Sequence, residues 1–306
     1  MDERERPEAG GPEGGAAAGR RTAVVTDSTA TLPPGWAAEQ GVEVVPLTVR
    51  LGGGEYLDGI ELPAEEFFRR LRDSGEPATT SQPSPQRFLA AYERAAAAGA
   101  REIAVITLSS RLSGSYSSAR AAADLWRERS DVPVHVWDSR AAAGGHGLLV
   151  TAAVRLADAG LDGPSLLVAL EKLRPSVHME AVVETLRYLA MGGRIGRAAA
   201  WAGTLFQVKP VIALAEDGVV EPVARVRTFR AALRWLLDSL ERRHPDHGRP
   251  LHLSVFHADN PEAAAFLEDG VHRLGYPLVE FWRADFTPVL GAHTGPGLAG
   301  LSDWQE

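Results

Sequence analysis

A hydroxyl-rich turn lies near the middle of the chain, directly after a short and largely apolar run. Residues 103–108 have the pattern of a buried strand, and the alanines after Tyr116 have the pattern of a helix. The turn between them contains Ser109, Ser110, Ser113, Gly114 and Ser115. At the carboxyl end of such a strand, the N–H groups and the dipole of the next helix favour a negative charge. We therefore expect one wall of an anion site here, although any single serine could instead cap the helix.

Three other predicted loops also offer hydrogen-bond donors. They contain Thr79-Thr80-Ser81, Arg194 after a glycine pair, and His293 among glycines. A carboxylate that leaves water needs several donors, and arginine supplies the strong, charge-assisted kind. Hydroxyls, a guanidinium and an imidazole together therefore predict a site for a carboxylate or a phosphate group. The alternatives are that Arg194 closes a helix end at the surface and that His293 is an ordinary buried histidine.

A serine hydrolase is the enzyme class to weigh against this prediction. Ser113 and His293 could form a two-residue arrangement, but the G-x-S-x-G elbow is absent and no acid is marked to orient the histidine. A nucleotide-dependent kinase would need G-x-x-x-x-G-K-[ST], which does not occur. Gly295, Gly297 and Gly300 match G-x-G-x-x-G literally, but six residues follow, where a dinucleotide site needs a helix and a later acidic residue.

The composition is that of an ordinary globular chain. Of 306 residues, 45% are hydrophobic and 24% are charged, and this length suits two compact domains. Forty acidic and 32 basic side chains give a formal charge of −8, which argues against a nucleic-acid partner. There is no cysteine and no histidine pair with metal-site spacing, so we expect neither a metal nor a cofactor. Without an apolar spanning run or signal segment, we expect a cytoplasmic protein that does not insert stably into membranes.

Strand and helix patterns divide the chain into two α/β domains. Residues 1–20 carry too little apolar surface to fold, so we predict a disordered arm. Over residues 21–163, strands alternate with helices, which favours a mainly parallel sheet flanked by helices. Over residues 164–306 the pattern changes, and Glu216-Asp217-Gly218 joins two strands as a hairpin. The second sheet should therefore be mixed, with antiparallel pairing.

Three local predictions concern the segments around the donors. Residues 42–51 alternate enough to form one strand. Residues 77–85 are too rich in proline for regular structure, so they are predicted to form a loop. Residues 291–300 are predicted to be a sharply turning glycine loop that presents His293. Because the donors come from both halves of the chain, they form a site only if the two halves meet.

Five motifs in this order closely resemble the DegV family of fatty-acid-binding proteins. They are Val25-Thr26-Asp27-Ser28, Thr80-Ser81-Gln82-Pro83-Ser84, Leu112-Ser113-Gly114-Ser115-Tyr116, Gly192-Gly193-Arg194-Ile195 and His293-Thr294-Gly295-Pro296-Gly297. Each motif is modest alone, but together they span nearly all of the chain after residue 20. One position departs mildly, because Ser115 stands where threonine is frequent in that family, and serine keeps the hydroxyl.

The resemblance implies a two-domain α/β protein that binds one long-chain fatty acid in a tunnel between the domains. By this likeness, the hydroxyls of Thr80 and Ser113 and the N–H of Gly114 hold the carboxylate. Arg194 and His293 complete a polar network around it. Further polar candidates in the same loops are Asp27, Ser28, Ser81 and Ser115.

The resemblance also implies a carrier rather than an enzyme. In carriers of this kind, a separate fatty acid kinase phosphorylates the bound carboxylate, and the acyl phosphate passes to phospholipid synthesis. The missing phosphate loop agrees with this expectation. Two other hypotheses stay open: an esterase or acyltransferase that uses Ser113 and His293, and a binding module for a phosphorylated or carboxylated metabolite without a long tail.

Overall fold

The computed structural model describes residues 20–75, 77–201 and 208–306. The predicted arm, residues 1–20, therefore lies outside the described residues except for its last position. Arg20 is held in place, because its side chain pairs with Asp158 and its Nη2 donates to Oε1 of Gln40 at 3.0 Å. The described part of the chain thus begins one residue before Arg21, where the sequence indicated that order starts.

The first sheet contains four strands, all parallel, in the order β2-β1-β6-β7. Its strands are β1(Thr22–Asp27), β2(Glu43–Val45), β6(Glu102–Thr107) and β7(Val134–Asp138). One face is covered by α3(Pro85–Ala97) and α4(Ser115–Arg127), and the other by α1(Trp36–Glu39), α5(Ala143–Asp158) and α6(Gly163–Leu173). Neighbouring residues of β1 point to opposite faces, so Val24 and Val25 join different apolar clusters.

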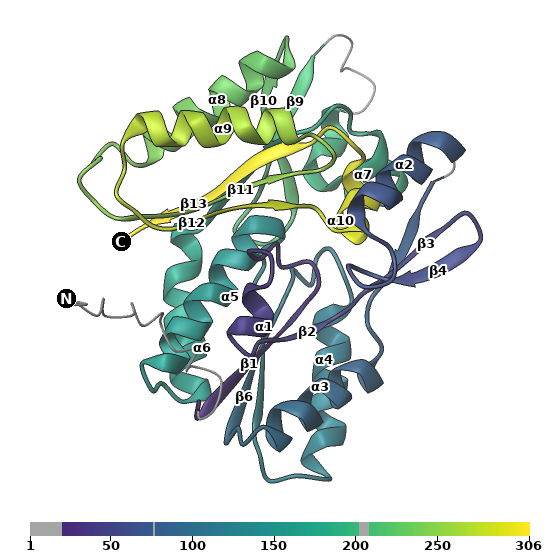
Figure 1. Cartoon of the computed structure of the whole chain (residues 1–306), viewed down its shortest axis with the longest axis vertical. Coiled ribbons are helices and arrows are strands. Elements are labelled where there is room, and N and C mark those ends of the chain that lie inside the picture. Colours follow the sequence, from purple (N-terminus) through teal and green to yellow (C-terminus); the bar gives the residue numbers. More distant parts are fainter. Residues whose placement is uncertain (1–19, 76, 202–207) are drawn as a thin grey trace, which may run out of the picture.

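A small antiparallel sheet, in the order β4-β3-β5, stands beside the first (Figure 1). It consists of β3(Thr48–Leu51), β4(Gly54–Leu57) and β5(Thr79–Ser81), and α2(Ala64–Ser74) connects the last two. The prediction of one strand over residues 42–51 is wrong, because β2 and β3 belong to different sheets. Pro46 stands between them, and proline has no N–H to extend a ladder.

The prediction of a loop over residues 77–85 is also wrong in part. Thr79–Ser81 forms β5 and pairs with β3. Prolines flank this segment at positions 77 and 83, but the three residues between them keep their N–H groups and can pair. This pairing places Thr80 next to the second unit, because α10 of that unit contacts β5.

The second sheet has six strands in the order β10-β9-β8-β13-β11-β12. The strands are β8(His178–Val182), β9(Lys209–Leu214), β10(Val220–Val226), β11(Leu251–His257), β12(Leu278–Asp285) and β13(Ala299–Gln305). Only β11 and β12 are parallel, so the predicted mixed sheet is confirmed. Helices α8(Phe229–Arg243) and α9(Pro261–Leu274) cover the face turned away from the first unit (Figure 1).

The two units interlock around α5 and α10. Helix α5 packs on β1 of the first sheet and on β11 and β13 of the second. Helix α10(Pro288–Thr294) belongs to the second half of the chain, yet it contacts α2, β3 and β5. The predicted boundary between residues 163 and 164 falls at the start of α6, and this helix packs on β6 and β7 of the first sheet. By these contacts α6 packs with the first unit, and the short 3-10 helix η1(Arg174–Ser176) follows it.

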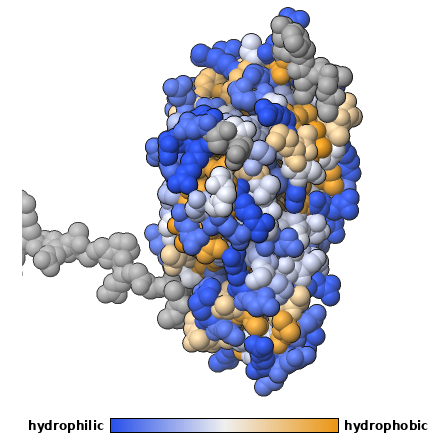
Figure 2. All heavy atoms as spheres, turned by 90° about the vertical axis from the view of Figure 1, so that its right-hand side faces the viewer, coloured by the Kyte–Doolittle hydropathy of each residue, from blue (hydrophilic) through white to orange (hydrophobic). Residues whose placement is uncertain are grey.

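The predicted fold class, two α/β units with one parallel and one mixed sheet, is confirmed. Figure 2 shows the side of the molecule that carries α2 and the β3–β4 hairpin, where apolar residues form small groups separated by hydrophilic ones. Within the described ranges, no helix combines the length and the apolar character needed to cross a bilayer.

Candidate ligand-binding site

A cavity lies between the two units, and 23 of the described residues line it. Seven of them are polar: Thr29, Thr80, Gln82, Ser113, Arg194, His293 and Thr294. The other lining residues are apolar and come from both units, and neither aspartate nor glutamate is among the described residues that line it. The volume of the cavity is about 90 Å³.

Thr80 and His293 meet at one end of the cavity although they belong to different units. Thr80 lies on β5 and His293 in the last turn of α10, and Thr80 Oγ1 is 2.7 Å from His293 Nε2. The prediction that His293 sits on a glycine loop is wrong. Pro288 starts a helix here, since it fits a first turn, and Gly295 ends it with a φ of 73°.

His293 is neutral near neutral pH. Burial and the neighbouring Arg194 guanidinium lower the pKa of His293 to about 4. Its Nδ1 atom is buried and has no hydrogen-bond partner among the described residues. A Cβ atom at Gly192 would lie 2.3 Å from this Nδ1, so only glycine lets the chain pass so close to the ring.

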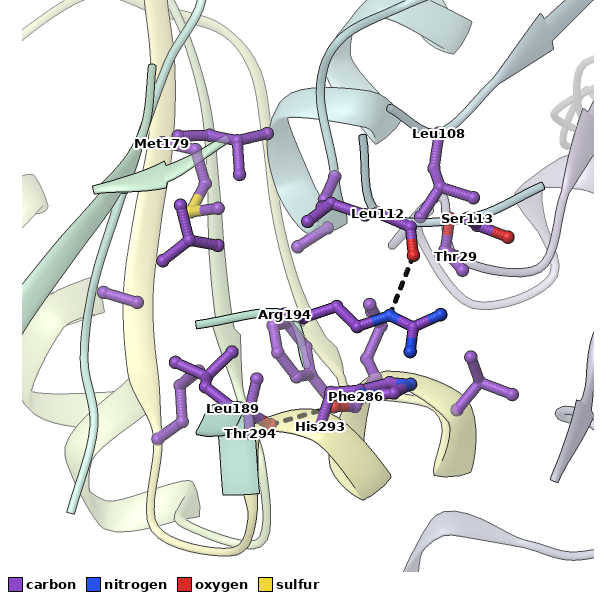
Figure 3. Close-up of a pocket in the computed structure, with 18 of the residues that line it drawn as sticks. Thr29, Leu108, Leu112, Ser113, Met179, Leu189, Arg194, Phe286, His293 and Thr294 are labelled. Carbon is purple, nitrogen blue, oxygen red and sulfur yellow. Dashed lines mark hydrogen bonds between the residues drawn. The ribbon is translucent and has the colours of Figure 1, made fainter. Parts of the chain in front are cut away.

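Arg194 is fixed by backbone carbonyls and reaches into the same end of the cavity. Its Nε donates to the carbonyl of Leu112 at 2.9 Å, and its Nη1 donates to the carbonyl of Gly192 at 2.6 Å. Figure 3 shows the guanidinium between the loop of Leu112 and Ser113 on one side and His293 on the other. No hydrogen bond joins Nη2 to the described part of the chain. The Nη2 amino group of the guanidinium therefore remains available to a ligand oxygen.

Ser113 is the one serine of the hydroxyl-rich turn that lines the cavity. Its Oγ accepts a hydrogen bond from the N–H of Ser115 at 3.2 Å and lies 3.0 Å from Ser115 Oγ. It therefore satisfies the N–H of the first residue of α4, whereas the N-cap position itself is Gly114 and has no side-chain capping bond, so the capping alternative does not hold in its usual form. Ser115 itself is buried, and a Cβ at Gly114 would lie 2.9 Å from the side chain of Gln82. Glycine at 114 thus brings this turn close to a lining residue.

Asp27 and Ser28 hold strand ends together and do not line the cavity. Asp27 Oδ2 accepts from the N–H of Leu108 at 2.9 Å, and Asp27 Oδ1 accepts from Thr29 Oγ1 at 2.6 Å. Ser28 Oγ donates to Asp58 Oδ2 at 2.6 Å. Asp27 therefore positions Thr29 and Leu108, and Ser28 Oγ accepts from the N–H of Leu47 at 3.1 Å; all three of these neighbours line the cavity. Ser81 lies on β5 next to Thr80 and is not a lining residue.

Sequence reasoning missed Asp58, a buried carboxyl group that connects the units. It accepts hydrogen bonds from Ser28 of the first unit and from the N–H of Val289 in α10 at 2.9 Å. Burial raises the pKa of Asp58 to about 6. No motif marks this residue. The approach of α10 to the first unit makes it important, and that approach is not visible in the sequence.

The chain matches one family model over residues 21–305, which is described as the DegV family of uncharacterised proteins. A DegV domain-containing protein of Streptomyces coelicolor is 36% identical over 282 residues, or 92% of this chain and 98% of the relative. Protein DegV of Bacillus subtilis is 33% identical over 282 residues, or 91% of this chain and 97% of the relative.

Solved structures share the whole fold. A DegV family protein from Thermus thermophilus, described by its fatty acid binding, is 34% identical with a TM-score of 0.86 and covers 94% of this chain and 100% of its own. DegV of Bacillus subtilis, described as a fatty acid binding protein, is 29% identical with a TM-score of 0.84 over 94% of this chain and 100% of its own. A stearic acid-binding protein from Eubacterium ventriosum is 27% identical with a TM-score of 0.83, and the match covers 92% of this chain and 97% of its own.

Proposed function

The chain belongs to the DegV family, and on that premise we propose that it binds one long-chain fatty acid in the cavity between its units. The carboxylate would lie among Thr80, Ser113, Arg194 and His293, with the N–H of Gly114 as a further donor. The names of the Thermus and Bacillus structures, which describe fatty acid binding, support the ligand class. The apolar remainder of the cavity lining supports an acyl tail.

One observation carries this proposal: hydrogen-bond donors from both units gather at one end of a cavity that is otherwise apolar. Thr80 and Ser113 come from the first unit, and Arg194 and His293 come from the second. Among the lining residues that the structure describes, none carries a negative charge that would repel a carboxylate. A head group held in this way joins the two units through the ligand.

The tail would supply most of the binding free energy. Burying one methylene group contributes roughly 0.8 kcal/mol, so about 14 methylenes would contribute on the order of 11 kcal/mol. Association costs several kcal/mol of this gain. The polar residues would then fix the orientation of the ligand and contribute a smaller share of the affinity. A tail-less metabolite would leave the apolar lining unused, which makes the third hypothesis less favourable.

We also propose that the protein is a carrier that presents the carboxylate to a separate fatty acid kinase. The support for this step is the family resemblance and the absence of a phosphate-binding loop motif from the sequence. The acyl phosphate would then serve phospholipid synthesis. Incubating the protein with oleate, ATP and a purified fatty acid kinase should form acyl phosphate only when all components are present.

The esterase hypothesis receives little support from the geometry. The hydrogen-bond partner of the His293 ring is Thr80, whereas Ser113 Oγ bonds to Ser115. In the described part of the chain, no carboxylate contacts His293 Nδ1 to orient the ring, as a catalytic triad requires. A chromogenic acyl ester should therefore give neither a burst nor turnover with the purified protein.

The direct test of fatty acid binding is extraction of the purified protein. Denaturation followed by mass spectrometry should release close to one long-chain fatty acid per chain. A protein purified without lipid that also fails to bind added palmitate or oleate would contradict the proposal. Binding of a short carboxylate or a phosphate ester that oleate does not displace would favour the tail-less metabolite instead.

A further inference from the structure

Met179 closes one end of the cavity together with Leu214. Met179 is the second residue of β8 and lines the cavity, so it is the outermost residue of that strand whose side chain faces this space. The register that pairs Glu180 with Ala213 places Met179 beside Leu214 of β9, and Leu214 pairs with Val220 of β10. These three lining residues therefore form one row across neighbouring strands.

The first turn of α5 supports this row from the side of the first unit. A Cβ atom at Gly145 would lie 3.5 Å from the Cβ of Met179 and 3.7 Å from Val177. The helix backbone is thus in close contact with the base of the Met179 side chain. Met179 is held between α5 on one side and Leu214 on the other, and it forms part of a wall rather than a loose surface.

A second, polar pocket begins on the far side of this row. Met179 and Leu214 line both spaces. The second pocket has a volume of about 280 Å³, and charged residues dominate its polar lining: Arg140, Arg174, Glu180, Glu216, Glu221 and Arg243. This charged lining suits water rather than an acyl chain.

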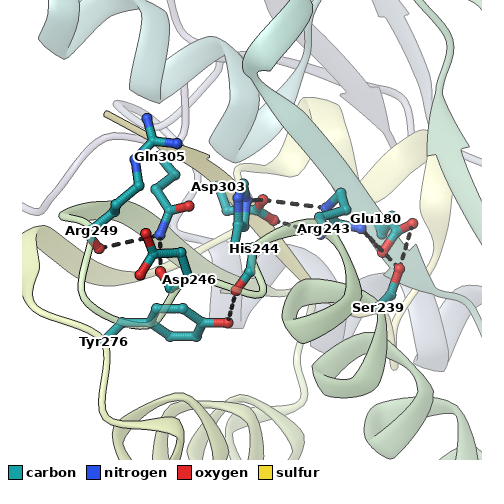
Figure 4. Close-up of polar contacts among 9 residues, drawn as sticks. All are labelled: Glu180, Ser239, Arg243, His244, Asp246, Arg249, Tyr276, Asp303 and Gln305. Carbon is teal, nitrogen blue, oxygen red and sulfur yellow. Dashed lines mark hydrogen bonds and ion pairs between the residues drawn. The ribbon is translucent and has the colours of Figure 1, made fainter.

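Glu180 shows why the polar pocket stays charged. It follows Met179 directly but points to the opposite face of β8. There Arg243 Nη1 lies 2.7 Å from Glu180 Oε2, and Ser239 Oγ donates to Glu180 Oε1 at 3.1 Å (Figure 4). Arg243 also pairs with buried Asp303. These charged groups pair with one another. An acyl chain that entered the pocket would remove water from them, and this desolvation costs free energy.

We propose that Met179 and Leu214 set the longest acyl chain that the protein buries completely. This inference rests on the proposed function, because it takes the cavity to be an acyl tunnel. Figure 3 shows Met179 on the opposite side of the cavity from Ser113, so a chain held by its carboxylate reaches Met179 with its methyl end. Each methylene before the row is buried among apolar side chains, and each methylene beyond it meets the polar pocket.

Affinities for a series of saturated acids test the proposal. With decanoic, lauric, myristic, palmitic, stearic and arachidic acids, the affinity of the wild-type protein should rise about fourfold per carbon and then level off at a limiting length. Met179→Ala removes the thioether and makes room for about two more methylenes, so the limiting length should increase by about two carbons. Leu214→Ala should act in the same direction, and Met179→Trp should shorten the limit.

Met191→Ala is the matched control, because Met191 is half exposed and does not line the cavity. The proposal is wrong if fatty acids bind but the limiting length is the same in the wild type, Met179→Ala and Leu214→Ala. Failure of the wild-type protein to bind any fatty acid would instead refute the proposed function. Circular dichroism checks folding, and if Met179→Ala does not fold, the shift in Leu214→Ala decides.

Discussion

At the scale of single residues, His293 determines which way the Thr80 hydroxyl points. A neutral imidazole carries one N–H, on Nδ1 or on Nε2. Among the described residues Nδ1 has no partner, and a buried N–H without an acceptor is less tolerable than a buried acceptor without a donor. We therefore infer that Nε2 carries the proton and donates it to Thr80 Oγ1. The hydrogen of the Thr80 hydroxyl is then free to donate into the cavity, toward a carboxylate.

Thr80→Val keeps the shape of the side chain and removes this donor. Leaving a buried carboxylate oxygen without its donor weakens the free energy of binding by about 1 to 3 kcal/mol, so palmitate affinity should fall by roughly tenfold or more. Ser113→Ala should have a similar effect. Isothermal titration calorimetry measures both. Thr79→Val is the matched control, since Thr79 is exposed and does not line the cavity. Unchanged affinity in both Thr80→Val and Ser113→Ala would refute the head-group assignment.

Arg194→Lys tests whether the planar guanidinium is required. Arginine uses Nε and Nη1 to hold two carbonyl groups and still offers Nη2, whereas the single ammonium group of lysine cannot do all three. We expect palmitate affinity to fall by about tenfold. Arg197→Lys, at an exposed position outside the cavity, should leave the affinity unchanged. Equal affinities of wild type and Arg194→Lys would show that only the positive charge matters.

At the scale of elements, α10 connects the candidate site to the rest of the fold. The helix carries His293 and packs against α2, β3 and β5 of the first unit. A Cβ at Gly291 would lie 2.6 Å from the ring of Phe68, so a glycine in this helix permits its close approach to α2. Asp58 accepts the N–H of Val289 in the first turn. The position of His293 therefore depends on contacts at both ends of a short helix.

The raised pKa of Asp58 predicts a pH-dependent contribution to stability. The folded protein holds this proton with a pKa of about 6, above the ordinary value of 3.8, so the folded state binds more protons than the unfolded state between these values. The contribution of this proton to the free energy of unfolding is on the order of 3 kcal/mol. It is fully present below pH 4 and is lost as the pH rises through 6. Asp58→Asn removes the titration and should therefore flatten the pH dependence of stability in this window.

Urea unfolding at several pH values between 4 and 7 measures this difference. The free energy of unfolding of Asp58→Asn relative to wild type should increase as the pH rises. Asp124→Asn is the control, because Asp124 is exposed on α4 and its partner is a surface arginine. Parallel pH profiles for wild type and Asp58→Asn would contradict the burial argument.

The elements show why some segments were mispredicted. Residues 291–300 have the composition of a turn, but Gly291 lies inside α10 and Gly300 lies inside β13. A Cβ at Gly300 would lie 2.5 Å from the carbonyl of Glu180 and from the ring of Phe256, so glycine here permits close packing at the centre of a sheet. Glycine for packing and glycine for turning look the same in a sequence.

At the scale of the whole molecule, the two units are joined by polar contacts around the cavity. Ser109 Oγ donates to the carbonyl of Gly218 at 2.8 Å, which docks the β9–β10 hairpin on the first unit. On the other side, Trp282 Nε1 donates to the carbonyl of Thr31 at 3.0 Å. These contacts hold the two walls of the cavity at a fixed separation, so the site depends on docking as well as on its own residues.

Gly218→Ala tests the docking of the hairpin. Gly218 has a φ of 78°, and a Cβ there would lie 2.2 Å from Ser109 Oγ, so alanine is both strained and too close. Gly53→Ala is the matched control, because Gly53 has a φ of 76° in another hairpin and nothing lies within 4 Å of its Cβ position. We expect Gly218→Ala to lower the free energy of unfolding by about 1 to 3 kcal/mol more than Gly53→Ala. Equal losses in the two variants would show that the contact is unimportant.

The sequence identified the donors by their chemical type, and the structure brings Thr80, Ser113, Arg194 and His293 to one cavity. Their positions were harder to predict, because Thr80 lies on a strand and His293 on a helix where loops were expected. Asp58 and Met179 gave no signal at all. A buried carboxyl group and a wall methionine acquire their roles from the contacts of distant segments, and no local pattern encodes such contacts.

The most direct test of the central claim is a crystal structure of the protein with bound palmitate. We predict that the carboxylate oxygens lie within hydrogen-bonding distance of Thr80 Oγ1 and Ser113 Oγ, and that the acyl chain runs from there toward Met179. A palmitate bound elsewhere, or one whose carboxylate lies at the Met179 end, would contradict the account.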